Sequence, residues 1–82
     1  MDMSNDIASK LNEIATRAAA LTDRDAAARV SRTLGSLAVQ ATGTPGLPAG
    51  TGDRLRTHAD YEEIRCPGEA VALWREAAAA VG

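Results

Sequence analysis

Large side chains are scarce in this sequence of 82 residues, which contains no Phe, a single Trp and a single Tyr. Leu, Ile and Val contribute 14 residues together, whereas Ala alone contributes 18. A chain of this length has room for one domain, and side chains this small bury little apolar surface. The composition therefore argues against an enclosed catalytic pocket. It favours a domain that completes a thin core by self-association or by docking on a partner protein.

An excess of basic charge is also missing, because nine Lys and Arg residues face eleven Asp and Glu residues, for a net charge of −2. Without a basic field, neither nucleic acid nor an anionic membrane surface is the expected partner. Eight of the nine basic residues are Arg. Together with the many alanines, this is typical of a GC-rich bacterial or phage coding sequence.

Cysteine and long apolar runs are lacking as well. Cys66 is the only cysteine, so no intramolecular disulfide can form, and a reducing cytoplasm is the expected location. Residues 1–6 lack the basic start and apolar run of a signal peptide. No segment approaches the ~18 to 20 apolar residues of a membrane span, so we expect no membrane association.

Apolar residues recur at helical spacing in the first half of the sequence. Two helices are predicted, over residues 5–21 and 22–42, because apolar positions follow one another every three or four residues. The first stripe consists of Ile7, Leu11, Ile14, Ala18 and Leu21, and the second of Ala26, Val30, Leu34, Leu37 and Ala41. Thr22 is the expected N-cap of the second helix, with Asp25 in a variant of the capping box. The tight junction at Thr22 predicts an antiparallel hairpin or a sharp bend.

Glycine and proline are concentrated in residues 43–52, which hold four Gly and two Pro and are predicted to form a loop. A third, weaker helix is expected to reach Arg65, capped by Asp53 or Thr57. Its expected inward residues are Leu55, Ala59, Tyr61 and Ile64. A last helix over residues 67–81 should begin with Pro67. Val71, Trp74, Ala78 and Val81 form its apolar stripe.

These patterns predict an all-α fold, a small four-helix domain of two helical hairpins with a Gly/Pro-rich central loop. The single domain covers residues 1–82. It divides into a hairpin (1–42), the loop (43–52) and two further helices (53–82).

Candidate chemistry is limited to one spacing. His58, Glu62 and Cys66 lie four residues apart, as zinc ligands on one helix would. Pro67 implies that the helix ends near Cys66, and no further Cys or His completes a tetrahedral site. No nucleophile, phosphate-loop or metalloprotease motif is present. We therefore expect no enzyme activity, no metal, no cofactor and no small-molecule substrate.

A helix-turn-helix is the alternative interpretation of the second stripe, because Gly35 follows Leu34 much as a glycine marks the turn of that motif. Its possible DNA contacts are Arg29, Arg32, Ser36 and Gln40. The apolar side chains around Ser36 offer base edges little, and the charge balance disfavours nucleic acid. A DNA-binding regulator of antitoxin or phage type thus remains the second hypothesis.

The leading hypothesis is a non-enzymatic protein–protein interaction module. It would act as a small adaptor, regulator or inhibitor through helix packing and self-association, with a protein partner or a second copy of itself as a homo-oligomer. The predicted interface comprises Ile7, Leu11, Ile14, Ala18, Leu21, Val71 and Trp74. Trp74 has two interpretations, as an interface anchor or as the centre of the fold.

Overall fold

Four helices make up the computed structural model, which describes residues 3–43, 47–65 and 68–82. They are α1 (Met3–Ala19), α2 (Arg24–Gly43), α3 (Thr51–Arg65) and α4 (Glu69–Val81). The described residues include no strand, so the predicted all-α class is confirmed. The predicted bounds of the first, second and fourth helices agree with the observed ones to within two residues. The third helix ends at Arg65 as predicted but begins at Thr51, so Asp53 and Thr57 lie inside it and the prediction that one of them caps it is wrong. Pro67 lies outside the described residues, and α4 begins at Glu69 after its N-cap, Gly68.

Asp23, not Thr22, caps the start of α2. Its Oδ1 atom accepts hydrogen bonds from the backbone N–H groups of Asp25 at 3.0 Å and Ala26 at 3.2 Å. Because α2 begins at Arg24, Thr22 lies one residue too early to reach these groups. The carboxylate of Asp23 also suits the positive end of the helix dipole. The prediction of a Thr22 cap is therefore wrong.

The connection between α2 and α3 is shorter than the predicted loop, because α2 includes Gly43 and α3 already begins at Thr51. Residues 44–46 of this connection lie outside the described residues. Thr51 starts α3 by donating from its backbone N–H, at 3.2 Å, and its hydroxyl, at 2.7 Å, to the carbonyl of Pro48. Gly50 precedes it with a positive φ of 87°, which glycine adopts without strain.

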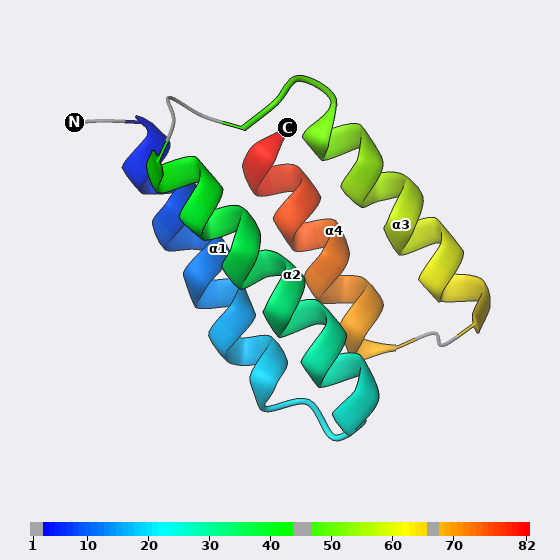
Figure 1. Cartoon of the computed structure of the whole chain (residues 1–82). Coiled ribbons are helices and arrows are strands. Elements are labelled where there is room, and N and C mark those ends of the chain that lie inside the picture. Colours follow the sequence, from blue (N-terminus) through cyan, green and yellow to red (C-terminus); the bar gives the residue numbers. More distant parts are fainter. Residues whose placement is uncertain (1–2, 44–46, 66–67) are drawn as a thin grey trace.

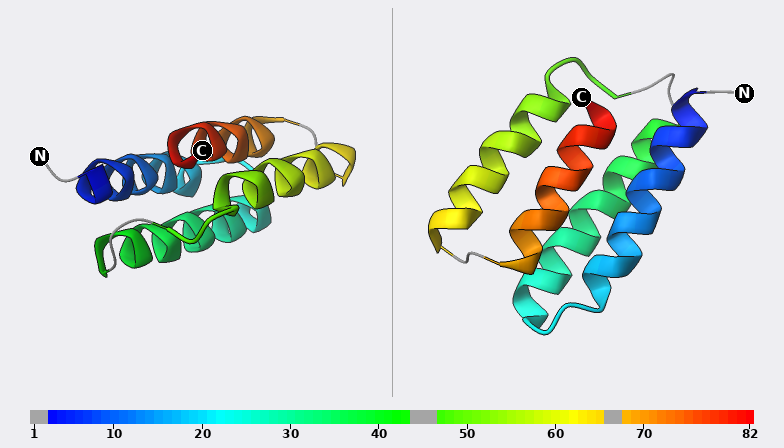
Figure 2. Two further views of the ribbon diagram at one scale, coloured as in Figure 1. Left: turned by 90° about the horizontal axis from the view of Figure 1, so that it is seen from above. Right: turned by 180° about the vertical axis from the view of Figure 1, so that it is seen from behind.

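The helices form a flat arrangement with extents of 36 × 23 × 15 Å (Figures 1 and 2). α1 packs beside α2, and α3 packs beside α4. α4 also contacts α1 and α2, whereas over the described residues the backbone of α3 comes close to no helix except α4. α4 therefore holds the two halves together.

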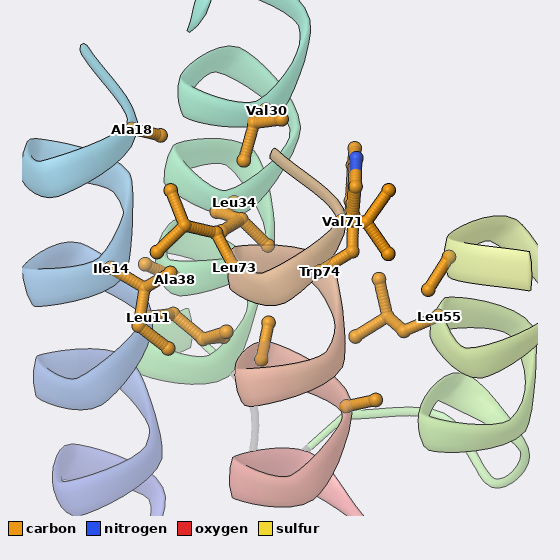
Figure 3. Packing of buried hydrophobic residues seen from close by; sticks show 13 residues of the cluster. Leu11, Ile14, Ala18, Val30, Leu34, Ala38, Leu55, Val71, Leu73 and Trp74 are labelled. Carbon is orange, nitrogen blue, oxygen red and sulfur yellow. The ribbon is translucent and has the colours of Figure 1, made fainter. Parts of the chain in front are cut away.

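Small side chains build the core between these helices (Figure 3). Its largest fully buried side chains are Leu11, Ile14, Val30 and Leu34. The fully buried alanines are Ala18, Ala38, Ala41, Ala59, Ala77 and Ala78. Alanines at these positions let neighbouring helices approach closely, which is how a chain with few large residues encloses a core.

The inward face of α3 differs from the prediction. Its buried positions include Leu55, Ala59 and Glu62, while Tyr61 is 56% exposed and Ile64 is 85% exposed. The stripe through positions 55 and 59 continues to 62 at helical spacing, so positions 61 and 64 point away from it. The expectation that Tyr61 and Ile64 face inward is therefore wrong.

None of the four helices, over the residues that the structure describes, is both long enough and apolar enough to span a bilayer.

Candidate functional site

The residues predicted as an interface lie inside the chain's own fold. Leu11, Ile14, Ala18, Val71 and Trp74 are buried in the core, and Ile7 and Leu21 are partly buried against it. α2 and α4 cover the stripe of α1, so these side chains are enclosed by one copy of the chain. A surface that receives a partner has to be sought among residues that remain accessible.

The turn required by the helix-turn-helix interpretation does not form. α2 runs without interruption through Gly35, and a β-carbon at Gly35 would meet nothing within 4 Å. The glycine therefore serves neither as a turn nor as a point of close helix contact. The possible DNA contacts, Arg29, Arg32, Ser36 and Gln40, are all exposed on α2.

A groove of about 350 Å³ lies between α2 and α3. It exists because α2 and α3 both flank α4 but do not pack on each other (Figure 1). Thr33, Leu37 and Gln40 line it from α2; Thr51, Arg54, Leu55 and His58 line it from α3; and Trp74 lines it from α4. We call this feature the α2–α3 groove.

Trp74 and His58 meet in the groove lining. Their ring centroids lie 4.5 Å apart with an interplanar angle of 69°, an edge-to-face arrangement. Trp74 itself is only 3% exposed, so it belongs to the core as well as to the groove. Leu55 is buried and Leu37 half-buried. The lining therefore combines apolar side chains with an imidazole and with polar side chains.

Beside the groove, Glu62 of α3 contacts Arg29 of α2 and so connects the two helices that line the groove. His58 Nε2 lies 3.4 Å from Glu62 Oε1, and Arg29 Nη2, reaching across from α2, lies 3.5 Å from Glu62 Oε2. The Glu62 side chain is 6% exposed, and a carboxylate this buried requires partners of this kind. The signal for its burial was present in the sequence, since Glu62 falls on the same helical stripe as Leu55 and Ala59.

Of the three possible zinc ligands named from the sequence, the structure brings together His58 and Glu62. Cys66, the third, lies outside the described residues. Among the described residues, no group of three or more His, Cys, Asp or Glu side chains is placed to hold a metal ion.

Two arginines away from the groove, Arg17 and Arg75, are paired with carboxylates of other helices. Arg17 donates to Glu76 at 2.7 Å, from α1 to α4. This hydrogen bond raises the pKa of Arg17 and lowers the pKa of Glu76. Arg75 donates to Asp60 at 2.9 Å and to Glu63 at 2.6 Å, and these hydrogen bonds raise the pKa of Arg75.

The other arginines differ in their partners. Arg56 pairs with Asp53. Arg54, at the groove wall, pairs with no carboxylate of the described residues, and the same holds for Arg24, Arg32 and Arg65, which do not line the groove. The groove therefore presents a guanidinium with free hydrogen-bonding capacity.

No protein-family model, no curated protein and no solved structure matches this chain.

Proposed function

We propose that the chain is a non-enzymatic protein-interaction module, a small adaptor, regulator or inhibitor, that receives a helix of a partner protein in the α2–α3 groove. The observation that carries the proposal is that, over the described residues, the backbones of α2 and α3 do not approach each other closely, although Arg29 reaches across to Glu62. These helices leave between them a trough lined by Leu37, Leu55 and Trp74. Another helix placed there would complete the packing around α4, as in helix-in-groove recognition.

The partner in this proposal is a different protein. The apolar stripe of α1 is already covered within the chain. Among the described residues, the large exposed apolar side chains are Val39 on α2 and the pair Tyr61 and Ile64, three residues apart on α3. A second copy therefore offers the groove only a short apolar patch, shorter than the roughly two turns of the lining, and self-association through it is an alternative outcome. The proposed setting is the reducing cytoplasm, and the proposed organisation is two hairpins joined by the Gly/Pro-rich segment.

Quantitative affinity capture from a lysate of the source organism tests the proposal. Leu37→Glu places a charge at the half-buried groove lining, and Thr33→Arg fills the groove from an exposed position. The matched control is Val39→Glu, on the same helix but 72% exposed and outside the groove lining. Both groove variants should lose the same captured protein, while the control retains it and all three keep wild-type helicity. Equal capture by all three variants would exclude the groove.

DNA binding is the second candidate, because Arg29, Arg32, Ser36 and Gln40 recur every three or four residues on exposed positions of one continuous helix. Arg29, however, is already engaged by Glu62. Binding to duplex DNA at ~50 mM salt, weakened by Arg32→Ala and by added salt, is the result that supports this role. Absence of binding under that condition removes it.

A further inference from the structure

We infer that the helix received by the α2–α3 groove is acidic and amphipathic, with a carboxylate that binds Arg54. This inference rests on the proposed function and specifies the chemistry of the partner. It follows from how charge is distributed between the groove and the rest of the surface.

The groove is more positive than the chain as a whole. Arg54 is the only Arg, Lys, Asp or Glu among the residues that line it, and the neighbouring Arg29–Glu62 pair is neutral in sum, which leaves a charge of +1 there. Since the whole chain carries −2, everything outside the groove carries −3. An acidic segment is therefore attracted to this trough and repelled by the remaining surface.

The hydrogen-bonding groups of the groove also favour an anionic partner, because its unused donors belong to a guanidinium. Glu62 already faces both His58 and Arg29, so its oxygens are engaged. The Arg54 guanidinium carries five N–H donors and no carboxylate of the described residues takes them. A carboxylate arriving on the partner would form charge-assisted hydrogen bonds with it, and these are the stronger kind.

The length and lining of the groove define the rest of the motif. On α2 the lining runs from Thr33 to Gln40 and on α3 from Thr51 to His58, about two helical turns on each wall. A partner helix would therefore contact the groove over about two turns. Its apolar residues, spaced three or four apart, would face Leu37 and Trp74. A nucleic-acid strand satisfies the charge but leaves this apolar lining without a partner, so a protein helix fits the groove better.

Trp74 provides the reporter for the test, because it is the only tryptophan of the chain and lines the groove. The full chain is titrated with three tryptophan-free helical peptides that share one leucine stripe. At all the remaining positions, the first peptide carries Glu, the second Gln and the third Lys. Trp74 fluorescence is recorded during each titration. The acidic peptide should bind on the order of tenfold more tightly than the neutral one, and added salt should reduce the difference. The basic peptide should bind most weakly.

Arg54→Glu is the decisive variant, with Arg24→Glu as its matched control. Both residues are exposed, and neither has a carboxylate partner among the described residues. Both substitutions change the net charge by the same amount. The difference between them is that Arg54 lines the groove and Arg24 does not. Arg54→Glu should reduce binding of the acidic peptide on the order of tenfold, while Arg24→Glu should change it much less. Equal losses in the two variants would show a general charge effect and overturn the role of Arg54.

The remaining outcomes separate this inference from the proposed function. If the three peptides bind equally and Leu37→Glu abolishes all binding, the groove receives a helix but the acidic inference is wrong. If none of the peptides changes Trp74 fluorescence, the acidic inference is overturned, and the affinity capture described above decides the proposed function by itself. Tighter binding of a single-stranded polynucleotide than of the acidic peptide would likewise overturn the choice of a protein helix.

Discussion

Replacing Leu11 by alanine tests whether one copy of the chain encloses its own core. Leu11 lies on α1, is 0% exposed, and packs in the core beside Ile14 (Figure 3). A Leu→Ala change at a fully buried site costs about 2 to 5 kcal/mol, because transfer free energy is lost and a cavity remains. Domains of this length have a total stability of roughly 4 to 12 kcal/mol. A single substitution should therefore remove a large share of the stability.

The expected shift is large enough to measure by thermal unfolding. At roughly 4 to 8 °C per kcal/mol for a domain of this size, a loss of ~3 kcal/mol lowers the Tm by about 12 to 24 °C. Far-UV circular dichroism, with light scattering, would follow unfolding at two protein concentrations about a hundredfold apart. The control is Val39→Ala, at a 72% exposed position, which should change the stability by no more than about 0.5 kcal/mol.

The concentration dependence decides where the core lies. If one copy encloses Leu11, the Tm of wild type and variant is the same at both concentrations. A Tm that rises with concentration would show that the stripe of α1 is shared between copies, as the composition suggests. An unchanged Tm in the Leu11→Ala variant would refute the burial on which the calculation depends.

Three further predictions concern local features of the fold. Gly52→Ala would place a β-carbon 3.0 Å from the backbone of Gly82, at the end of α4. This substitution should lower the free energy of unfolding, measured with denaturant, by about 1 to 3 kcal/mol. Gly35→Ala, with open space around the new β-carbon, should instead raise it by about 0.5 to 1 kcal/mol. Asp23→Ala removes the cap of α2 and should cost about 1 kcal/mol by the same measurement; an unchanged midpoint would show that the cap contributes nothing. Because Arg17 lowers the pKa of Glu76 below its usual 4.5, their ion pair stabilises the fold above that pH and is lost as the pH falls through the lowered pKa. Glu76→Gln should therefore melt slightly below wild type at pH 7, and a difference that persists in strong acid would contradict this linkage.

The positions of the four helices follow from the sequence alone. The first, second and fourth predicted helices agree with the observed ones to within two residues, because the recurrence of apolar residues every three or four positions is a local property of the chain. The prediction of inward-facing residues failed on α3, where the apolar pattern is weakest. On α3 the bulky residues Tyr61 and Ile64 were placed inward, although the stripe of the helix continues through the carboxylate of Glu62.

Tertiary structure alone decided what covers each stripe. The sequence marks Leu11 and Trp74 as apolar on one helix face, but this holds equally for a core and for an interface. Only the packing of α4 against α1 and α2 shows that these side chains are enclosed within one chain. The same packing keeps α2 and α3 apart, which creates the groove and brings Arg29 to Glu62 across 33 positions of sequence. Such contacts depend on distances between helices that are remote in sequence, and no local periodicity encodes them.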